Sequence, residues 1–209
     1  MNKAEIPFLT VAELSELIRK KEISPVEATE AYLDRIESLD FKFNAYLTVC
    51  RKEALQAALE AEQDIARGQY IGPMHGIPVA VKDQIWSKGI RTTVGSRFMG
   101  DFVPEEDATA LANLKQAGAI LLGKTNLTEF ALSGSQRYSP NRNPWDLDRF
   151  TGGSSAGSGS ATAAFLCATS LGEDTGGSIR RPAAWCGLAG LRPSWGRVSR
   201  YGVAPGSWS

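Results

Sequence analysis

The chain has 209 residues, of which 43% are hydrophobic and 22% charged, an ordinary composition for a globular protein with no sign of a fibrous or disordered chain. Lysine plus arginine and aspartate plus glutamate number 23 each, so no surplus of positive charge favours direct binding to nucleic acid or to an anionic membrane. Three widely spaced cysteines, Cys50, Cys167 and Cys186, include no CxxC pair and indicate neither a disulfide framework nor a zinc site.

Three helices are predicted in the N-terminal third of the chain. Thr10 followed by Glu13 forms a capping box before apolar residues at helical spacing, and Ser24 followed by Glu27 repeats this start signal. Residues 51–67, rich in alanine, leucine and glutamate, predict the third helix. We expect these helices to pack on the outside of the segments that follow.

An α/β arrangement is predicted after the helices. Residues 77–81 are a short apolar run with β-branched side chains, which is typical of a buried strand. Asp107 is expected to cap a helix, and residues 119–122 predict a second buried strand. Strand, helix and strand in this order are typical of an α/β layer. We therefore divide a single domain into a helical segment, residues 1–70, and a catalytic α/β segment, residues 71–209.

Residues 118–125, Gly-Ala-Ile-Leu-Leu-Gly-Lys-Thr, match the phosphate-loop pattern GxxxxGK[ST] letter for letter. A phosphate loop needs its variable residues between a strand and a helix, with backbone amides pointing inward. Here those residues are apolar, and they form a predicted strand that follows a helix. We therefore reject ATP binding.

His75 is the only histidine, so any mechanism that needs two imidazoles is excluded and a Ser-His-Asp triad would have to use this one residue. Lys82 is therefore the candidate general base. Lys82 ends the apolar strand, where burial lowers the pKa of an amine and lets the neutral form accept a proton. A surface lysine paired with Asp83 is the competing interpretation, and this segment alone leaves the two open. His75 itself is expected to pack or cap within a loop.

Two glycine-rich segments carry candidate nucleophiles. Residues 152–160 predict a tight, rigid loop that leads into a small-residue helix at residues 161–167, with a flexible linker as the alternative. A second glycine turn, at residues 172–182, contains a serine. Its successive amides would form a concave nest for a developing oxyanion, although in isolation a plain turn is the alternative. These amides belong to Thr175, Gly176, Gly177 and Ser178.

Together these segments resemble the amidase signature family, over nearly the whole chain. The motifs that carry the resemblance are Gly-Ile-Pro-Val-Ala-Val-Lys-Asp at 76–83, Gly-Lys-Thr-Asn at 123–126, Asn-Pro-Trp-Asp at 143–146, Gly-Gly-Ser-Ser at 152–155, Asp-Thr-Gly-Gly-Ser-Ile-Arg at 174–180 and Gly-Leu-Arg-Pro-Ser at 190–194. Ala156 and Gly157 depart mildly from the family, which usually shows two glycines there. Family members also continue well past residue 209.

The resemblance implies an α/β fold with a central mixed β-sheet flanked by helices, incomplete at the C-terminus. It also implies a Ser-cisSer-Lys triad in which Lys82 is the base, Ser154 follows a cis peptide bond and Ser178 is the nucleophile. The amides of residues 175–178 would then form the oxyanion hole. By the same resemblance, the pocket for the acyl group includes Ala131 and Ser133.

Three hypotheses about function follow from the resemblance. The first is a stand-alone amidase that hydrolyses a small or medium carboxamide through a serine acyl-enzyme. The second is the glutaminase subunit of an aspartyl/glutamyl-tRNA amidotransferase. Residues 196–202 match the pattern of that subunit, whereas Arg181 and residues 203–206 depart from it. The third is a truncated, inactive family member.

The expected partner is a small-molecule amide, with no cofactor, no metal, no direct contact with nucleic acid and no membrane. The N-terminal residues lack the features of a secretory signal, and no run approaches about 18 apolar residues, so we expect a cytoplasmic protein. The sequence leaves the oligomeric state open, with a homo-oligomer as one alternative.

Overall fold

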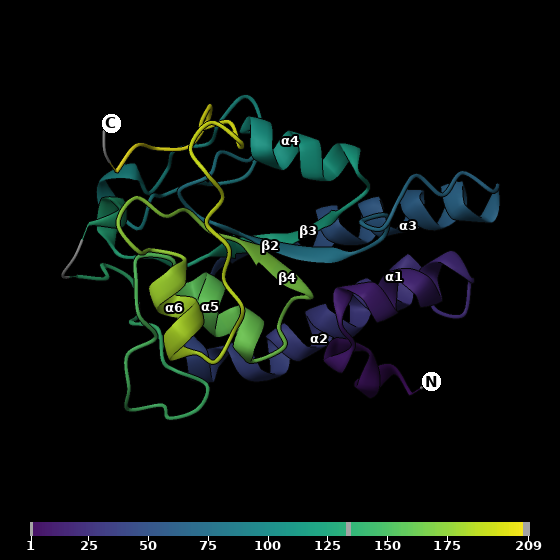
Figure 1. The fold of residues 1–209 in the computed structure, drawn as a ribbon, viewed down its shortest axis with the longest axis horizontal. Coiled ribbons are helices and arrows are strands. Elements are labelled where there is room, and N and C mark those ends of the chain that lie inside the picture. Colours follow the sequence, from purple (N-terminus) through teal and green to yellow (C-terminus); the bar gives the residue numbers. More distant parts are fainter. Residues whose placement is uncertain (1, 133–134, 207–209) are drawn as a thin grey trace.

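A four-stranded mixed sheet lies at the centre of the protein (Figure 1), in a computed structural model that describes residues 2–132 and 135–206. The strands are β1 (Tyr46–Val49), β2 (Pro78–Lys82), β3 (Ile120–Thr125) and β4 (Thr169–Leu171). They lie in the order β1-β3-β2-β4. β2 runs parallel to both β3 and β4, whereas β1 runs antiparallel to β3.

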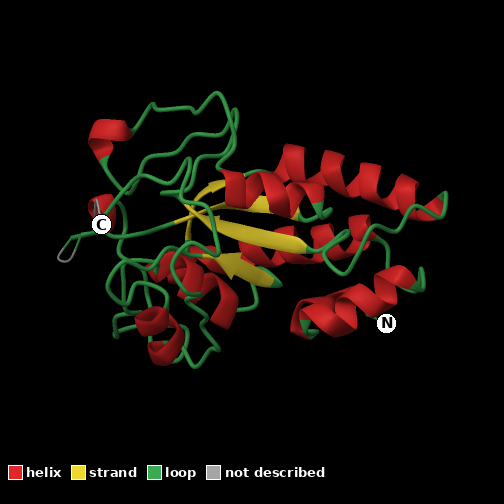
Figure 2. Cartoon of the chain, turned by 45° about the horizontal axis from the view of Figure 1, so that its top comes forward, coloured by secondary structure: helices red, strands yellow, loops and turns green. Residues whose placement is uncertain are grey.

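Helices cover both faces of this sheet (Figure 2), which confirms the predicted α/β fold with a mixed sheet. The α-helices are α1 (Val11–Arg19), α2 (Pro25–Phe43), α3 (Arg51–Ala66), α4 (Thr109–Gln116), α5 (Ala156–Ala163) and α6 (Arg180–Trp185). Short 3-10 helices are η1 (Lys3–Phe8), η2 (Arg97–Met99) and η3 (Glu129–Ala131). None of the helices in the described part of the chain has the length and apolar character needed to cross a bilayer.

The N-terminal helices begin where the capping boxes predict. The Glu13 amide donates to Thr10 Oγ1 at 3.2 Å, and the Thr10 amide donates back to Glu13 Oε2 at 2.8 Å. Ser24 and Glu27 make the same pair of bonds at the start of α2. Each box satisfies two amides that a helix terminus otherwise leaves without partners, which fixes the first turn.

The apolar faces of these helices pack on the sheet in the larger of two core clusters, and a smaller cluster is formed by Val81, Ile85, Ala108, Leu111 and Leu121. α2 and α3 pack against each other, and both contact β3. The core is built mainly from aliphatic side chains with one fully buried tyrosine, and its most buried members include Leu14, Ile18, Tyr32, Leu33, Ile77, Ile120 and Leu122.

Asp107 was expected to cap a helix, and that prediction is wrong. Ala108 occupies the cap position of α4 and makes no side-chain cap bond. Asp107 instead accepts a hydrogen bond from the Lys88 amide at 2.8 Å and pairs with Lys115 Nζ at 2.7 Å. The carboxylate therefore ties the preceding loop to the last turn of α4 rather than starting the helix.

The predicted helix at residues 161–167 begins five residues too late and ends four residues too late, since α5 stops at Ala163. α5 starts at Ala156, inside the segment expected to be a loop, because the close approach of this helix to the sheet requires its glycines. A Cβ on Gly157 would lie 2.5 Å from the Asn126 amide nitrogen and would also clash with the Ala45 carbonyl oxygen. The rest of the segment, residues 152–155, remains a buried loop.

Two short strands are not predicted by the sequence. β1 lies within residues 1–70, so this segment contributes a strand to the sheet besides its helices. β4 has only three residues and forms the outer strand beside β2. The second predicted strand extends to Thr125, so the lysine of the phosphate-loop pattern lies in β3 with its side chain fully buried. This placement excludes a phosphate loop at residues 118–125.

Candidate active site

Lys82 is the last residue of β2, and its side chain has no exposed surface. Alternation along the strand sends Lys82 and the next residue, Asp83, to opposite faces of the sheet. Asp83 pairs with Lys124 at 3.5 Å, where both side chains are fully buried. The interpretation of Lys82 as a surface lysine paired with Asp83 is therefore wrong.

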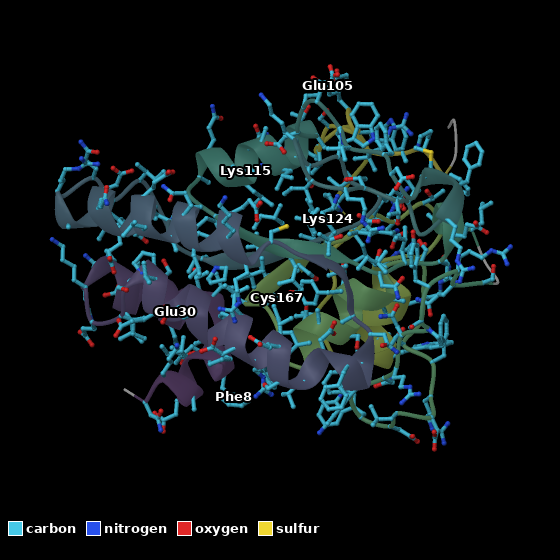
Figure 3. All side chains as sticks on the ribbon, turned by 180° about the vertical axis from the view of Figure 1, so that it is seen from behind. Phe8, Glu30, Glu105, Lys115, Lys124 and Cys167 are labelled. Carbon is cyan, nitrogen blue, oxygen red and sulfur yellow. The ribbon has the colours of Figure 1, made fainter. Side chains whose placement is uncertain are left out.

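The Lys124 side chain, labelled in Figure 3, lies in the interior of the protein. Its Nζ donates to the Ile85 carbonyl at 2.6 Å and to Thr92 Oγ1 at 2.8 Å, in addition to its pairing with Asp83. The Asp83 carboxylate accepts two bonds from Thr93, one from the amide and one from the hydroxyl. This second buried lysine is thus enclosed by fixed acceptors and faces away from Lys82.

Lys82 Nζ lies 2.8 Å from Ser154 Oγ. The chain reaches Ser154 through a cis peptide bond between Gly153 and Ser154, the position at which the resemblance implied one. Ser154 is itself 3% exposed, and its carbonyl accepts a hydrogen bond from the Thr128 amide at 3.3 Å. The structure therefore brings together, in contact and away from bulk water, two of the three expected triad side chains.

Burial lowers the pKa of Lys82 to about 8, because an ammonium loses its hydration inside the protein. The carboxylate of Glu173 opposes this effect, since its Oε2 lies 3.2 Å from Lys82 Nζ and favours the charged form. A substantial fraction of the amine is consequently neutral at mildly alkaline pH, and that form can accept a proton.

Ser178 lies two residues before the start of α6. Its carbonyl accepts a hydrogen bond from the Ser155 amide at 3.2 Å, so the backbone of the 172–182 turn is tied directly to the residue after Ser154. The Ser178 residue is 5% exposed, and within residues 2–132 and 135–206 its hydroxyl makes no hydrogen bond. A hydroxyl without an internal partner is free to act as a nucleophile.

The four amides expected to form an oxyanion hole differ in their surroundings. Thr175 and Gly176 are exposed, and a Cβ on Gly176 would meet open space. The Gly177 amide donates to Asp174 Oδ1 at 2.6 Å, so it points at that carboxylate. Within the described chain, the amides of Thr175, Gly176 and Ser178 have no hydrogen-bond acceptor.

Asp174 organises this turn, a role that the sequence pattern did not predict. Its carboxylate accepts bonds from the backbone amides of Gly177, Ile179 and Arg180 and pairs with the Arg180 guanidinium at 3.0 Å. Burial raises the pKa of Asp174, but these hydrogen bonds outweigh it and hold the pKa well below the ordinary value. The carboxylate is therefore ionised across the working range and fixes the geometry of the turn.

Of the two residues expected in an acyl pocket, Ala131 is half-buried at the end of η3 and Ser133 lies outside the described residues. Ala131 adopts a positive φ of 59°, and its amide donates to the carbonyl of Thr128. Because the Thr128 amide in turn bonds Ser154, the segment before Ala131 borders the site.

In the part of the chain that the structure describes, no group of three or more histidine, cysteine, aspartate or glutamate side chains is placed to hold a metal ion. Cys50, Cys167 and Cys186 are all free and buried. Burial raises the pKa of each of the three thiols to about 11, so they remain protonated near neutral pH.

Comparison with known proteins points to the amidases. The Amidase family model matches residues 27–209. The A subunit of glutamyl-tRNA(Gln) amidotransferase from Carboxydothermus hydrogenoformans is 50% identical over 202 residues, which cover 95% of this chain and 42% of that protein. The protein of the same name from Geobacter metallireducens is 54% identical, again over 95% of this chain and 41% of that protein.

A solved structure supports the same grouping at the level of the fold. The peptide amidase from Stenotrophomonas maltophilia superposes with a TM-score of 0.88 and 37% identity, over 94% of this chain and 42% of that chain. The present chain thus spans about two fifths of the length of these relatives. The extent of the family match, together with the motifs at 76–83, 152–155 and 174–180, shows that the chain belongs to the amidase family.

Proposed function

We propose that this chain carries the nucleophile and the base of an amide hydrolase, with Ser178 as nucleophile, Ser154 as proton relay and Lys82 as general base. The observation that carries the proposal is the 2.8 Å contact between Lys82 Nζ and Ser154 Oγ, made by a lysine with no exposed surface. A buried lysine in contact with a serine hydroxyl has a lowered pKa and a partner for proton transfer, which are the two properties that a lysine base requires.

The reaction would proceed through an acyl-enzyme. Ser178 Oγ attacks the amide carbonyl carbon while its proton passes to Ser154, whose own proton passes to neutral Lys82. The carbonyl oxygen gains negative charge, which the amides of residues 175, 176 and 178 stabilise. The C–N bond then breaks as the proton returns through Ser154 to the leaving nitrogen. Water attacks the ester carbonyl by the same proton route and releases the carboxylic acid and Ser178.

Gly177 has a supporting part in this proposal. Its amide bond to Asp174 keeps the turn in one conformation, and its φ of +113° is a backbone conformation that residues with a side chain rarely adopt. The neighbouring amides are thereby fixed before the substrate arrives, so little reorganisation is needed as charge develops. Ala131, which we propose for the acyl pocket together with Ser133, is linked to Ser154 through Thr128.

Ammonia release from a panel of primary carboxamides and peptide amides tests the proposal. We expect the wild-type chain to release ammonia and the Ser178→Ala variant to release none above the uncatalysed rate. Equal rates for the two proteins would overturn the assignment of Ser178. A wild-type chain that folds but releases no ammonia would favour the truncated, inactive family member instead.

A second candidate is the glutaminase subunit of a tRNA-dependent amidotransferase. The named relatives favour it, since proteins named as the A subunit of glutamyl-tRNA(Gln) amidotransferase are 48–54% identical to this chain. Hydrolysis of free glutamine separates the candidates. A glutaminase that responds strongly to charged tRNA and partner subunits would establish the amidotransferase function, whereas turnover of other carboxamides without them would establish the stand-alone amidase.

A further inference from the structure

Glu173 is the only carboxylate in the described chain that forms an ion pair with Lys82. Its Oε2 lies 3.2 Å from Lys82 Nζ, and its main-chain carbonyl oxygen lies 3.4 Å from the same nitrogen. The other carboxylate oxygen, Oε1, accepts a hydrogen bond from Thr175 Oγ1 at 2.6 Å. The side chain is 19% exposed, so the carboxylate bridges the buried amine and the edge of the site.

The backbone of Glu173 is held by Ser155. Ser155 Oγ donates to the Glu173 carbonyl at 3.1 Å and accepts from the Glu173 amide at 3.3 Å. The carbonyl that faces Lys82 is therefore fixed independently of the side chain. A substitution at Glu173 changes the carboxylate while this backbone contact can remain.

The hydrogen-bonding capacity of neutral Lys82 determines which of these oxygens its lone pair can face. Lys82 in its neutral form has two N–H groups and one lone pair, and three oxygen atoms surround its nitrogen: Ser154 Oγ, Glu173 Oε2 and Glu173 O. When the two Glu173 oxygens accept the two N–H groups, the lone pair is left for Ser154. The geometry points to Glu173 as a positioning residue that orients the Lys82 amine toward Ser154, an inference that rests on the proposed function.

The same contact gives Glu173 a measurable electrostatic effect. Burial lowers the pKa of Lys82, and Glu173 makes the largest opposing contribution, with a smaller one from Asp174. Asp174 is itself paired with the guanidinium groups of Arg180 and Arg192. Asp83 and Lys124 lie on the other face of the sheet and neutralise each other. Removing the charge of Glu173 therefore favours neutral Lys82, whereas removing its oxygens frees the amine to rotate.

Rates of Ser178 acylation by a neutral phosphonate probe, measured from pH 6 to about pH 10, test the inference on the chain as it stands. Glu173→Gln keeps an oxygen acceptor but loses the charge, so we expect the acid limb of the profile to move about one unit toward lower pH with its plateau preserved. Glu173→Ala loses the acceptor as well, and we expect its plateau to fall about tenfold because the amine is no longer oriented. Glu173→Asp should recover part of that plateau.

Glu37→Gln is the matched control. Glu37 is an exposed carboxylate on α2 that pairs with Arg51, and neither residue belongs to the candidate site. Its profile should coincide with that of the wild type. Profiles of Glu173→Gln and Glu173→Ala that also coincide with the wild type would overturn the inference. A thermal melt of each variant ensures that the compared proteins are folded.

A second readout separates this inference from the proposed function. The Lys82 side chain can be titrated by NMR with 13C-labelled lysine, its signal being identified by its loss in Lys82→Met. We expect the midpoint to fall by about one pH unit in Glu173→Gln. If Ser178 of the wild type is never acylated, the proposed function fails while the NMR shift still supports the Lys82–Glu173 coupling. If Ser178 is acylated but neither the profile nor the NMR midpoint moves, the role of Glu173 is wrong.

Discussion

Burial of Lys82 is the residue-level feature on which the proposed chemistry depends. An exposed lysine is almost fully protonated near pH 7 and cannot accept a proton, whereas a pKa of about 8 leaves a usable neutral fraction. The neutral form grows as pH rises through that value. Activity that depends on neutral Lys82 should therefore rise from pH 6 to about pH 9 and level off above it.

Lys82→Ala should lower the rate of Ser178 acylation about a hundredfold or more at pH 8, since proton transfer by a positioned base contributes about 10²–10⁴ to rate. The rise with pH through about 8 should disappear as well. Probe incorporation, measured in reactions quenched at set times across the pH range, checks both expectations. Lys52→Ala, an exposed lysine on α3, is the matched control and should behave as the wild type does. A Lys82→Ala protein that keeps most of its activity at pH 7 would refute the base assignment.

The buried pair of Asp83 and Lys124 should matter for stability rather than for proton transfer. Asp83→Ala leaves the Lys124 ammonium without its counter-charge, and removing one partner of a buried ion pair costs about 3–5 kcal/mol of unfolding free energy. The double variant Asp83→Leu, Lys124→Met removes both charges and should recover a large part of that loss. Urea denaturation of the three proteins measures this coupling, and additive effects in the double variant would contradict it.

At the level of elements, the capping boxes determine where α1 and α2 begin. α2 is the longest helix in the described chain and contacts η1, α3, α5 and two strands of the sheet. A change at its first turn therefore acts on an element that much of the core depends on.

Ser24→Ala should destabilise the protein by about 1 kcal/mol, because the Glu27 amide at the start of α2 loses its side-chain hydrogen-bond acceptor. Ser38→Ala on the exposed surface of the same helix is the control, since it exchanges the same residues without touching a cap. It should change the unfolding free energy little. Equal losses for the two variants in urea denaturation would show that the capping box contributes nothing.

The start of α5 sets the distance between the site and the sheet. Gly157→Ala would force a methyl group against Ala45 and Asn126, and overpacking of this kind costs about 1–3 kcal/mol. Ser155 is the N-cap of α5 and directly follows Ser154, so a displacement of α5 should also slow Ser178 acylation. Denaturation and probe labelling of one preparation check both effects. A Gly157→Ala protein with the stability and the acylation rate of the wild type would contradict the close packing of α5 on the sheet.

For the molecule as a whole, motif and periodicity predicted the family, the α/β fold and the long helices. These features depend on local signals, since capping boxes and apolar runs act within a few residues. The apolar run predicted that Lys82 ends a strand, and the family resemblance implied a cis bond before Ser154; the structure has both. The catalytic roles of Lys82, Ser154 and Ser178 stay predictions.

The features that sequence missed depend on tertiary contacts. β1 and β4 are three or four residues long and carry no clear alternation, so pairing with β3 and β2 is what makes them strands. The glycines of α5 looked unsuited to a helix until the sheet surface that they approach was known. Glu173 gave no signal of its own, because only the fold brings it to Lys82 from 91 positions away in the sequence.

Mapping of the covalent adduct is the measurement that tests the central claim most directly. After reaction with a phosphonate probe, peptide mass spectrometry of the wild-type chain should place one adduct on the peptide that contains Ser178. The Ser178→Ala variant should carry none, and Ser155→Ala should still carry some. An adduct on another serine of the Ser178→Ala protein would mean that the nucleophile, and with it the route through Ser154 to Lys82, has been wrongly assigned.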